Sequence, residues 1–227
     1  MMNFISKKFL GVMAALVIFA VPAFADITVG VDAVSKYVMR GTAVGSGVAL
    51  QPSVDYTLGG GGGGLFAEGG TTVGLWGSYS LVNGVNDEIN IALAQTVGSA
   101  TITVTDYYFP FATGEERTRE GNSFFEFADD GGHAAEVGAS VDVANASLFL
   151  GRFVSGATKE DTYAELSYPL SDDFSLVLGV GDGALAAEGD FALVNAGLVV
   201  TGDSGYGASF TVNPDAETAY LVVSKSW

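Results

Sequence analysis

Residues 48–58, with the sequence VALQPSVDYTL, contain the pattern that decides the fold. The even positions hold Val, Leu, Pro, Val, Tyr and Leu, whereas the odd positions hold Ala, Gln, Ser, Asp and Thr. Successive side chains of a β-strand point to opposite faces of the sheet, so this segment is a strand with an apolar face and a polar face. We expect the apolar face to contact an apolar environment and the polar face to contact water.

The same two-faced pattern recurs along the chain and predicts about twelve strands of roughly ten residues each. An even number of such strands closes an antiparallel barrel, and about 10 to 14 strands fit the pattern. The sequence therefore predicts an all-β fold, a single antiparallel transmembrane β-barrel. The predicted strands are residues 27–39, 48–58, 65–79, 87–97, 100–109, 134–143, 146–154, 162–170, 174–181, 191–200, 206–213 and 218–227.

The N-terminus has the three parts of a cleaved secretory signal peptide. Lys7 and Lys8 precede an apolar run over residues 9–21, and the small-x-small sequence at 23–25 follows Pro22. The run of about 13 residues is shorter than the roughly 20 that a membrane-spanning helix needs, which disfavours an uncleaved anchor. We expect residues 1–25 to be removed and residues 26–227 to form the exported barrel. The chain contains no Cys, so it lacks disulfides, thiolate metal ligands and the lipid-attachment residue of a lipoprotein.

The composition indicates which environment the protein occupies and which partners are disfavoured. The chain holds 26 Asp and Glu against 9 Lys and Arg, and loss of Lys7 and Lys8 with the leader takes the formal charge from −17 to −19. A surface this negative repels phosphate backbones, which disfavours nucleic acid as a partner. Mean hydropathy is +0.37, yet the mature chain has no apolar run long enough for a transmembrane helix. Amphipathic strands in an outer membrane account for a high mean hydropathy without a transmembrane helix.

The predicted connections alternate in length, as they do in outer-membrane barrels, where periplasmic turns are short and extracellular loops longer. The predicted periplasmic set is 59–64, 98–99, 144–145, 171–173 and 201–205, and the predicted external set is 41–47, 81–86, 110–133, 155–161 and 182–190. A soluble sandwich or lipocalin-like barrel would also have amphipathic strands. Ionisable residues at mid-strand on the polar face favour a hydrated lumen over those soluble folds.

The sign of the inward-facing charges decides which ions a pore prefers, because rings of carboxylates favour cations. Acidic residues outnumber basic ones on the predicted polar face, which predicts a weak cation preference. An alternative is an internal ion-pair network that fills a narrow lumen, with Lys36 and Arg40 bridging carboxylates and little conduction. The predicted lumen-facing charges are Asp32, Lys36, Arg40, Asp55, Glu68, Glu88, Glu136 and Glu165.

The last strand ends at Trp227 and resembles the C-terminal signal that the barrel-assembly machinery reads, although Lys225 occupies a usually apolar position. Aromatic residues near strand ends are candidates for interfacial girdles, with ordinary sheet packing as the alternative. These residues are Tyr37, Tyr56, Trp76, Tyr79, Tyr107, Tyr108, Phe109 and Tyr168.

The stretch SKYVMRGTAVGSGVALQPSVDYTL resembles the first hairpin of the TorF-like porin family, around the step formed by Tyr37, Arg40 and Gly41. GLWGSYS, DEINIALAQTVGSATITVTDYYFP, TYAELSYPL and YLVVSKSW are also similar to that family, so the resemblance covers most of the mature chain. Lys36, Trp227 and the six-glycine turn depart from the family pattern. The resemblance implies a porin-like outer-membrane barrel and no catalytic residues.

These patterns together predict a porin-like channel for small solutes or ions. The alternatives are a non-conducting structural or adhesive barrel and a membrane-edge lipid-modifying enzyme. The sole His133, near Asp129, Asp130 and Ser123, is better interpreted as a solvated loop residue than as a general base. We expect no catalytic residue, metal or cofactor; the expected partners are outer-membrane lipid, the barrel-assembly machinery and the transported solutes.

Overall fold

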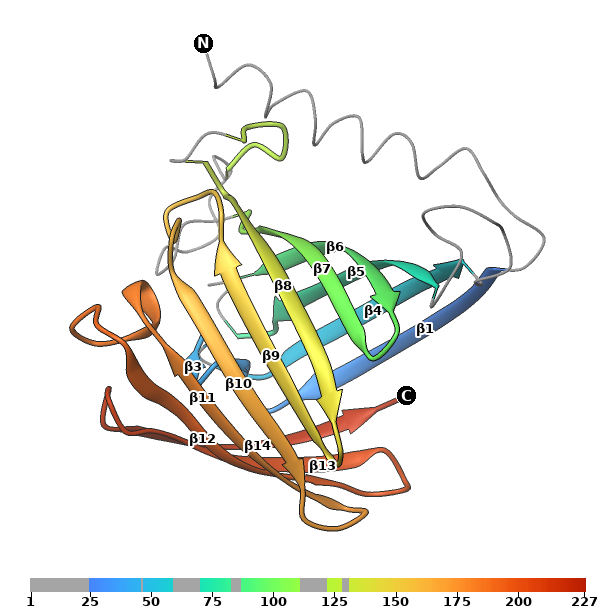
Figure 1. The fold of residues 1–227 in the computed structure, drawn as a ribbon, viewed down its shortest axis with the longest axis vertical. Coiled ribbons are helices and arrows are strands. Elements are labelled where there is room, and N and C mark those ends of the chain that lie inside the picture. The colour runs from blue at the N-terminus through green and yellow to red at the C-terminus, as the bar shows by residue number, and fades with distance from the viewer. Residues whose placement is uncertain (1–24, 46, 59–69, 83–86, 111–121, 128–130) are drawn as a thin grey trace.

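The computed structural model describes residues 25–45, 47–58, 70–82, 87–110, 122–127 and 131–227. Twelve strands of this part of the chain form one closed antiparallel barrel, in which neighbours in sequence are neighbours in space and β1 closes against both β4 and β14 (Figure 1). The barrel strands are β1 (Ala25–Val34), β4 (Ala49–Leu58), β5 (Thr71–Ser80), β6 (Glu88–Val97), β7 (Ala100–Tyr108), β8 (His133–Val143), β9 (Ala146–Phe153), β10 (Thr162–Pro169), β11 (Phe174–Gly181), β12 (Ala192–Thr201), β13 (Tyr206–Asn213) and β14 (Thr218–Ser226).

The predicted all-β class and the twelve-stranded antiparallel barrel are confirmed. Most strand boundaries differ from the prediction by only a few residues. The first strand differs more, because β1 ends at Val34 and not at Met39, and the predicted strand 65–79 is a described strand only from Thr71 onward. Residues 35–48 instead form a connection that carries two further short strands, β2 (Val38–Met39) and β3 (Thr42–Ala43). The predicted leader up to residue 24, the six-glycine turn 59–64 and Glu68 lie outside the described residues.

The outer face of the barrel is apolar. Ile27 and Val29 on β1 are 67% and 70% exposed, and Leu221 on β14 is 68% exposed. Alternate positions on the same strands carry Thr28, Asp32 and other polar residues, and these point to the lumen. A barrel with an apolar exterior and a polar interior is the arrangement that the alternation in residues 48–58 predicts. Among the described residues no helix has the length and apolarity to cross a bilayer.

Most connections separate by length between the two ends of the barrel; the exception is the short turn of residues 214–217 after β13, which lies at the end with the long connections. The short turns after β6, β8, β10 and β12 lie at one end, because each strand reverses the chain direction. The connections after β1, β5, β7, β9 and β11 lie at the other end, as predicted, and the last of these contains the short 3₁₀ helix η2 (Gly183–Leu185). The prediction that residues 41–47 face outside is wrong, since this connection folds into the lumen.

Closure of the barrel is uneven. β1 pairs with β4 along its whole length, from Ala25 opposite Leu58 to Val34 opposite Ala49. Its pairing with β14 covers only three residue pairs, from Asp32 opposite Ser226 to Val34 opposite Ser224. The seam between the first and last strands is therefore much shorter than the other strand pairings.

Candidate functional site in the barrel lumen

The connection after β1 leaves the barrel wall at Ser35. The Ser35 N–H donates to the Val223 carbonyl at 2.8 Å, and the Val223 N–H donates to Ser35 Oγ at 2.9 Å. Beyond this point the chain turns inward, and β2 and β3 pair to form a small hairpin inside the barrel. We refer to residues 35–45 as the inward hairpin. The polar and aromatic side chains of residues 36–40 find their partners in the lumen, which explains why β1 does not continue to Met39.

The tip of the inward hairpin is pressed against the opposite wall. Arg40 and Gly41 occupy the turn with φ of 51° and 80°, the left-handed region that two-residue β-turns of this kind require. A Cβ on Gly41 would lie 1.8 Å from the Val194 carbonyl oxygen of β12. Only glycine fits this position, because any side chain would collide with the β12 backbone.

Arg40 holds the hairpin to β8. Its Nη2 lies 2.8 Å from Glu136 Oε2, and the two side chains are 10% and 3% exposed. The Tyr107 hydroxyl donates to the same carboxylate oxygen at 2.9 Å. The Glu136 side chain has room because Gly151 lies diagonally across on β9, where a Cβ would approach Glu136 Oε1 to 2.3 Å. The ion pair is thus buried in the lumen and joins residues 96 positions apart.

Aromatic rings surround the Arg40 guanidinium. Its Cζ lies 4.6 Å from the Tyr163 ring centroid, 5.6 Å from that of Phe149 and 5.7 Å from that of Phe153. Cation–π attraction of this kind strengthens when the site is shielded from water. The cation is therefore held by one carboxylate and three rings from β9 and β10.

Tyr37 holds the base of the hairpin to β5 and β6. Its hydroxyl donates to Glu88 Oε2 at 3.1 Å, and Asn90 Nδ2 donates to Glu88 Oε1 at 2.8 Å. The Tyr37 and Trp76 ring centroids are 5.4 Å apart. Glu88 is fully buried, so these donors replace the water that its carboxylate would otherwise bind.

A third polar cluster joins β10 and β12. The Tyr163 hydroxyl donates to Glu165, and Asn195 Nδ2 donates to the Tyr163 hydroxyl at 3.2 Å. This cluster lies beside Arg40, because the guanidinium stacks on the ring of the same tyrosine. The inward hairpin and the walls it contacts consequently form one continuous polar and aromatic filling of the lumen.

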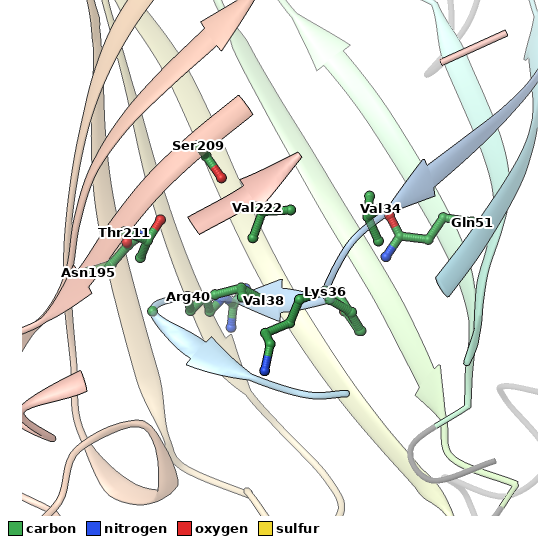
Figure 2. Close-up of a pocket in the computed structure, with 11 residues that line it drawn as sticks. Val34, Lys36, Val38, Arg40, Gln51, Asn195, Ser209, Thr211 and Val222 are labelled. Carbon is green, nitrogen blue, oxygen red and sulfur yellow. The ribbon is translucent and has the colours of Figure 1, made fainter. Parts of the chain in front are cut away.

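A pocket of about 190 Å³ lies between the inward hairpin and the β12–β14 wall (Figure 2). None of the described residues that line it is acidic. Lys36 is the cation in this pocket that forms no ion pair with the described residues, and its Nζ lies 5.8 Å from the Tyr220 ring centroid. The polar lining residues are Lys36, Tyr37, Arg40, Gln51, Asn195, Ser209 and Thr211.

The structure places the predicted charged residues in three groups. Glu88 and Glu136 contact the inward hairpin directly, and Glu165 lies beside it in the Tyr163 cluster. Asp32 on β1 and Asp55 on β4 lie on the inward face, away from these contacts. Lys36 and Arg40 are inside the barrel and not on the first strand, where the prediction placed them, and of the two only Arg40 bridges to a carboxylate within the part of the chain that the structure describes.

Three of the residues predicted for the aromatic girdle lie inside the barrel instead. Tyr37, Trp76 and Tyr107 point inward and belong to the lumen, so their assignment to the girdle is wrong. At the short-turn end, Tyr206 and Trp227 are exposed, and Lys225 Nζ lies 4.9 Å and 5.2 Å from their ring centroids. Lys225 therefore stands between two aromatic rings on the outer face, which accounts for a cation in a usually apolar position.

His133 is not a solvated loop residue, as the sequence suggested, but the buried first residue of β8. Alternation along β8 puts it on the outer face, opposite to Glu136. Its Nδ1 lies 2.8 Å from Asp106 Oδ2 and its Nε2 lies 2.8 Å from the Phe124 carbonyl oxygen. The rings of Phe124, Phe127 and Tyr108 pack around the imidazole. Residues 122–127 thus fold over the outside of the wall at this end.

Sequence reasoning missed the aromatic partners of Arg40, which are Phe149, Phe153 and Tyr163. The available signal was their position, since all three alternate with apolar residues and share the face of Glu136 or Glu165. An aromatic ring on a polar face indicates a contact inside the lumen. Within the described part of the chain no group of three or more His, Asp or Glu is arranged to hold a metal ion. No protein-family model, curated protein or solved structure matches the chain.

Proposed function

We propose that the protein is an outer-membrane barrel that lets small solutes or ions pass through a lumen narrowed by the inward hairpin, with a weak preference for cations. The observation that carries the proposal is the closed barrel with an apolar outer face and a charged interior. A barrel pairs the backbone groups of neighbouring strands with one another, as a bilayer requires, apart from the stretch of β14 that β1 does not reach, and its polar interior can enclose water. The leader and the terminal strand with Trp227 support export and assembly into that membrane.

The cation preference follows from the charges on the inward face. Five of the predicted carboxylates, Asp32, Asp55, Glu88, Glu136 and Glu165, lie on the lumen face of the described strands, and two cations inside the barrel, Lys36 and Arg40, oppose them. Arg40 neutralises Glu136, so the acidic excess rests on the other carboxylates. Asp55 is exposed within the lumen and is the best placed to attract a passing cation.

Conductance across a planar bilayer tests this proposal. We expect discrete channel steps and a reversal potential on the cation side under a KCl gradient. Asp55→Asn should reduce the selectivity, whereas Asp172→Asn, in an exposed turn, should change it less. Anion selectivity of the unaltered chain would contradict the preference.

A non-conducting barrel is the second candidate, and the extent of the inward hairpin favours it. The hairpin contacts β5, β6, β8, β9, β10 and β12, which is much of the barrel circumference. If the unaltered chain gives no channel steps and a variant with a displaced hairpin does, the hairpin is a plug. If neither gives steps, the protein is a structural barrel.

We propose no enzymatic role for His133. A general base needs a ring nitrogen with a free lone pair, and both nitrogens here face acceptors, the Asp106 carboxylate and the Phe124 carbonyl. The imidazole bridges the Asp106 carboxylate and the Phe124 carbonyl and so anchors residues 122–127. This assignment predicts that His133→Ala leaves conductance intact.

Location in the outer membrane is tested separately. Fractionated cells should contain the protein in the outer-membrane fraction, and the unboiled protein should migrate differently on a gel from the boiled protein. Recovery as a dissolved periplasmic protein would overturn the proposal. The residues that carry the resemblance to TorF-like porins, Tyr37, Arg40 and Gly41, all belong to the inward hairpin, which supports a role for that segment in the channel.

A further inference from the structure

The N-terminal half of β14 is not paired with β1. Hydrogen bonds show which backbone groups of β14 face β1. Val223 is hydrogen-bonded to Ser35, and the backbone N–H and C=O groups of Trp227 are hydrogen-bonded to those of Val31. Every second residue faces the same side, so the N–H and C=O groups of Leu221 and Ala219 also point toward β1. The chain has left the wall at Ser35, before it could reach these residues, and no described strand pairs with this edge of β14.

A second copy of the chain cannot close this edge. The free half of β14 lies near the end with the long connections, whereas the free half of β1, residues 25–30, lies near the end with the short turns. Two barrels inserted in the same orientation would place these antiparallel edges at different depths in the membrane. Pairing β14 with its own copy would be parallel, because both strands run in the same direction. In the proposed membrane location this unpaired stretch of β14 therefore borders the lipid.

The pocket of Figure 2 lies directly behind this opening. Its wall includes Val34, the last residue of β1, and Val222, which points inward between Leu221 and Val223 of β14. Lys36 reaches the Tyr220 ring, which belongs to the unpaired half of β14. A cation that pairs with no carboxylate of the described residues thus lies at the inner side of a gap whose outer side is bordered by the exposed Leu221.

We propose that this lateral opening binds a single-chain anionic amphiphile, with its carboxylate at Lys36 and its hydrocarbon tail passing through the seam into the membrane. Charge complementarity selects the head group, because the pocket contains an unpaired cation and its described lining has no acid. The hydroxyls and amides of Ser209, Thr211 and Gln51 provide further hydrogen bonds. The inference rests on the proposed membrane location and adds a lateral route to the axial one.

Binding of laurate to the refolded full chain tests the inference. Radiolabelled laurate is dialysed to equilibrium against the protein in a non-ionic detergent and against protein-free micelles. We expect saturable binding of laurate, weaker binding of dodecanol, which lacks the charge, and no binding of acetate, which lacks the tail. Equal binding of dodecanol and laurate would overturn the charge argument.

Two matched pairs of variants locate the site. Lys36→Gln should weaken laurate binding roughly tenfold, about the contribution of one desolvated charge pair, whereas Lys159→Gln in an exposed loop should not change it. Val222→Trp should abolish binding by filling the pocket, whereas Leu150→Trp puts the same bulk on the outer face of β9, away from the seam, and should retain it. Gel mobility checks that each variant folds, and Ser209→Phe replaces Val222→Trp if that variant does not fold.

The outcomes separate this inference from the proposed function. Unchanged laurate affinity in Lys36→Gln and in the pocket-filling variant would refute the lateral site. Ion conductance and membrane fractionation would still decide the channel proposal independently. Conversely, saturable laurate binding by a barrel that gives no channel steps would uphold the lateral site and refute the axial pore.

Discussion

Two connections at the same end of the barrel dock on opposite sides of its wall. The connection after β1 folds inward, where Tyr37 and Arg40 bond Glu88 and Glu136. In the connection after β7, residues 122–127 fold over the outer face, where Phe124 and Phe127 pack on His133. The wall presents carboxylates on its inner face and apolar groups on its outer face. The side chains of a connection therefore decide on which face it docks, since each face binds the chemistry that complements it.

The two docked segments are also held with different strength. The inward hairpin depends on a buried ion pair, where removal of one partner leaves an uncompensated charge. The outer segment depends on ring contacts and on several separate hydrogen bonds, among them the contact of His133 with the Phe124 carbonyl and the bond from the Tyr108 hydroxyl to the Asn122 carbonyl, so the loss of any one of them costs less. Substitutions that test this contrast should therefore have their largest effects in the lumen.

The largest expected effect is that of Arg40→Ala. It leaves the Glu136 carboxylate buried with only the Tyr107 hydroxyl as a donor, and we expect the free energy of unfolding to fall by ~3–5 kcal/mol. Urea unfolding followed by gel mobility measures this change. The double variant Arg40→Met with Glu136→Gln should recover much of the loss, because it removes both charges. A double variant as unstable as Arg40→Ala would contradict the ion-pair account.

Gly41→Val should have the next largest effect. The left-handed backbone and the contact with the Val194 carbonyl together should cost about 2 kcal/mol or more, and the hairpin tip should move away from β12. We expect a larger unit conductance in a planar bilayer. Gly45→Val is the matched control, because a Cβ at Gly45 has only an ordinary contact at 3.8 Å. Equal conductance of the two variants would show that the hairpin tip does not limit the flow of ions through the lumen.

His133→Ala tests the outer segment. Loss of the imidazole removes the bond to the Phe124 carbonyl and leaves Asp106 without its partner, at a cost of about 1–3 kcal/mol. We expect chymotrypsin to cleave within residues 122–127 faster, while the rest of the barrel stays resistant. Conductance should not change. An altered conductance would mean that this segment also controls the pore.

The smallest expected effect is that of Phe125→Ser. Phe125 is 86% exposed and has a ring contact with Phe124 alone among the described residues, so its substitution should change stability by less than about 0.5 kcal/mol. Phe124→Ser should be more disruptive, because that ring also packs on Tyr108 and His133. Proteolysis rates rank the two variants. Equal rates would show that Phe124 does not anchor the segment.

The sequence by itself determined the strands, their two faces and the end at which each connection lies. These features depend on alternation and on chain reversal at turns, both of which are local and can be read residue by residue. The charged residues on the predicted strands after the first, such as Glu88 and Glu136, could be placed on the inward face for the same reason.

Only the tertiary structure decided that residues 35–45 leave the wall, which cation reaches which carboxylate, and where the barrel closes incompletely. Alternation continues through Lys36 and Met39, so the local pattern does not mark the end of β1. The chain turns inward because Arg40 meets Glu136, 96 positions away, and Gly41 fits against Val194. Such partners become neighbours only when twelve strands curve into a closed wall, and spacing along the chain does not encode distances across a lumen.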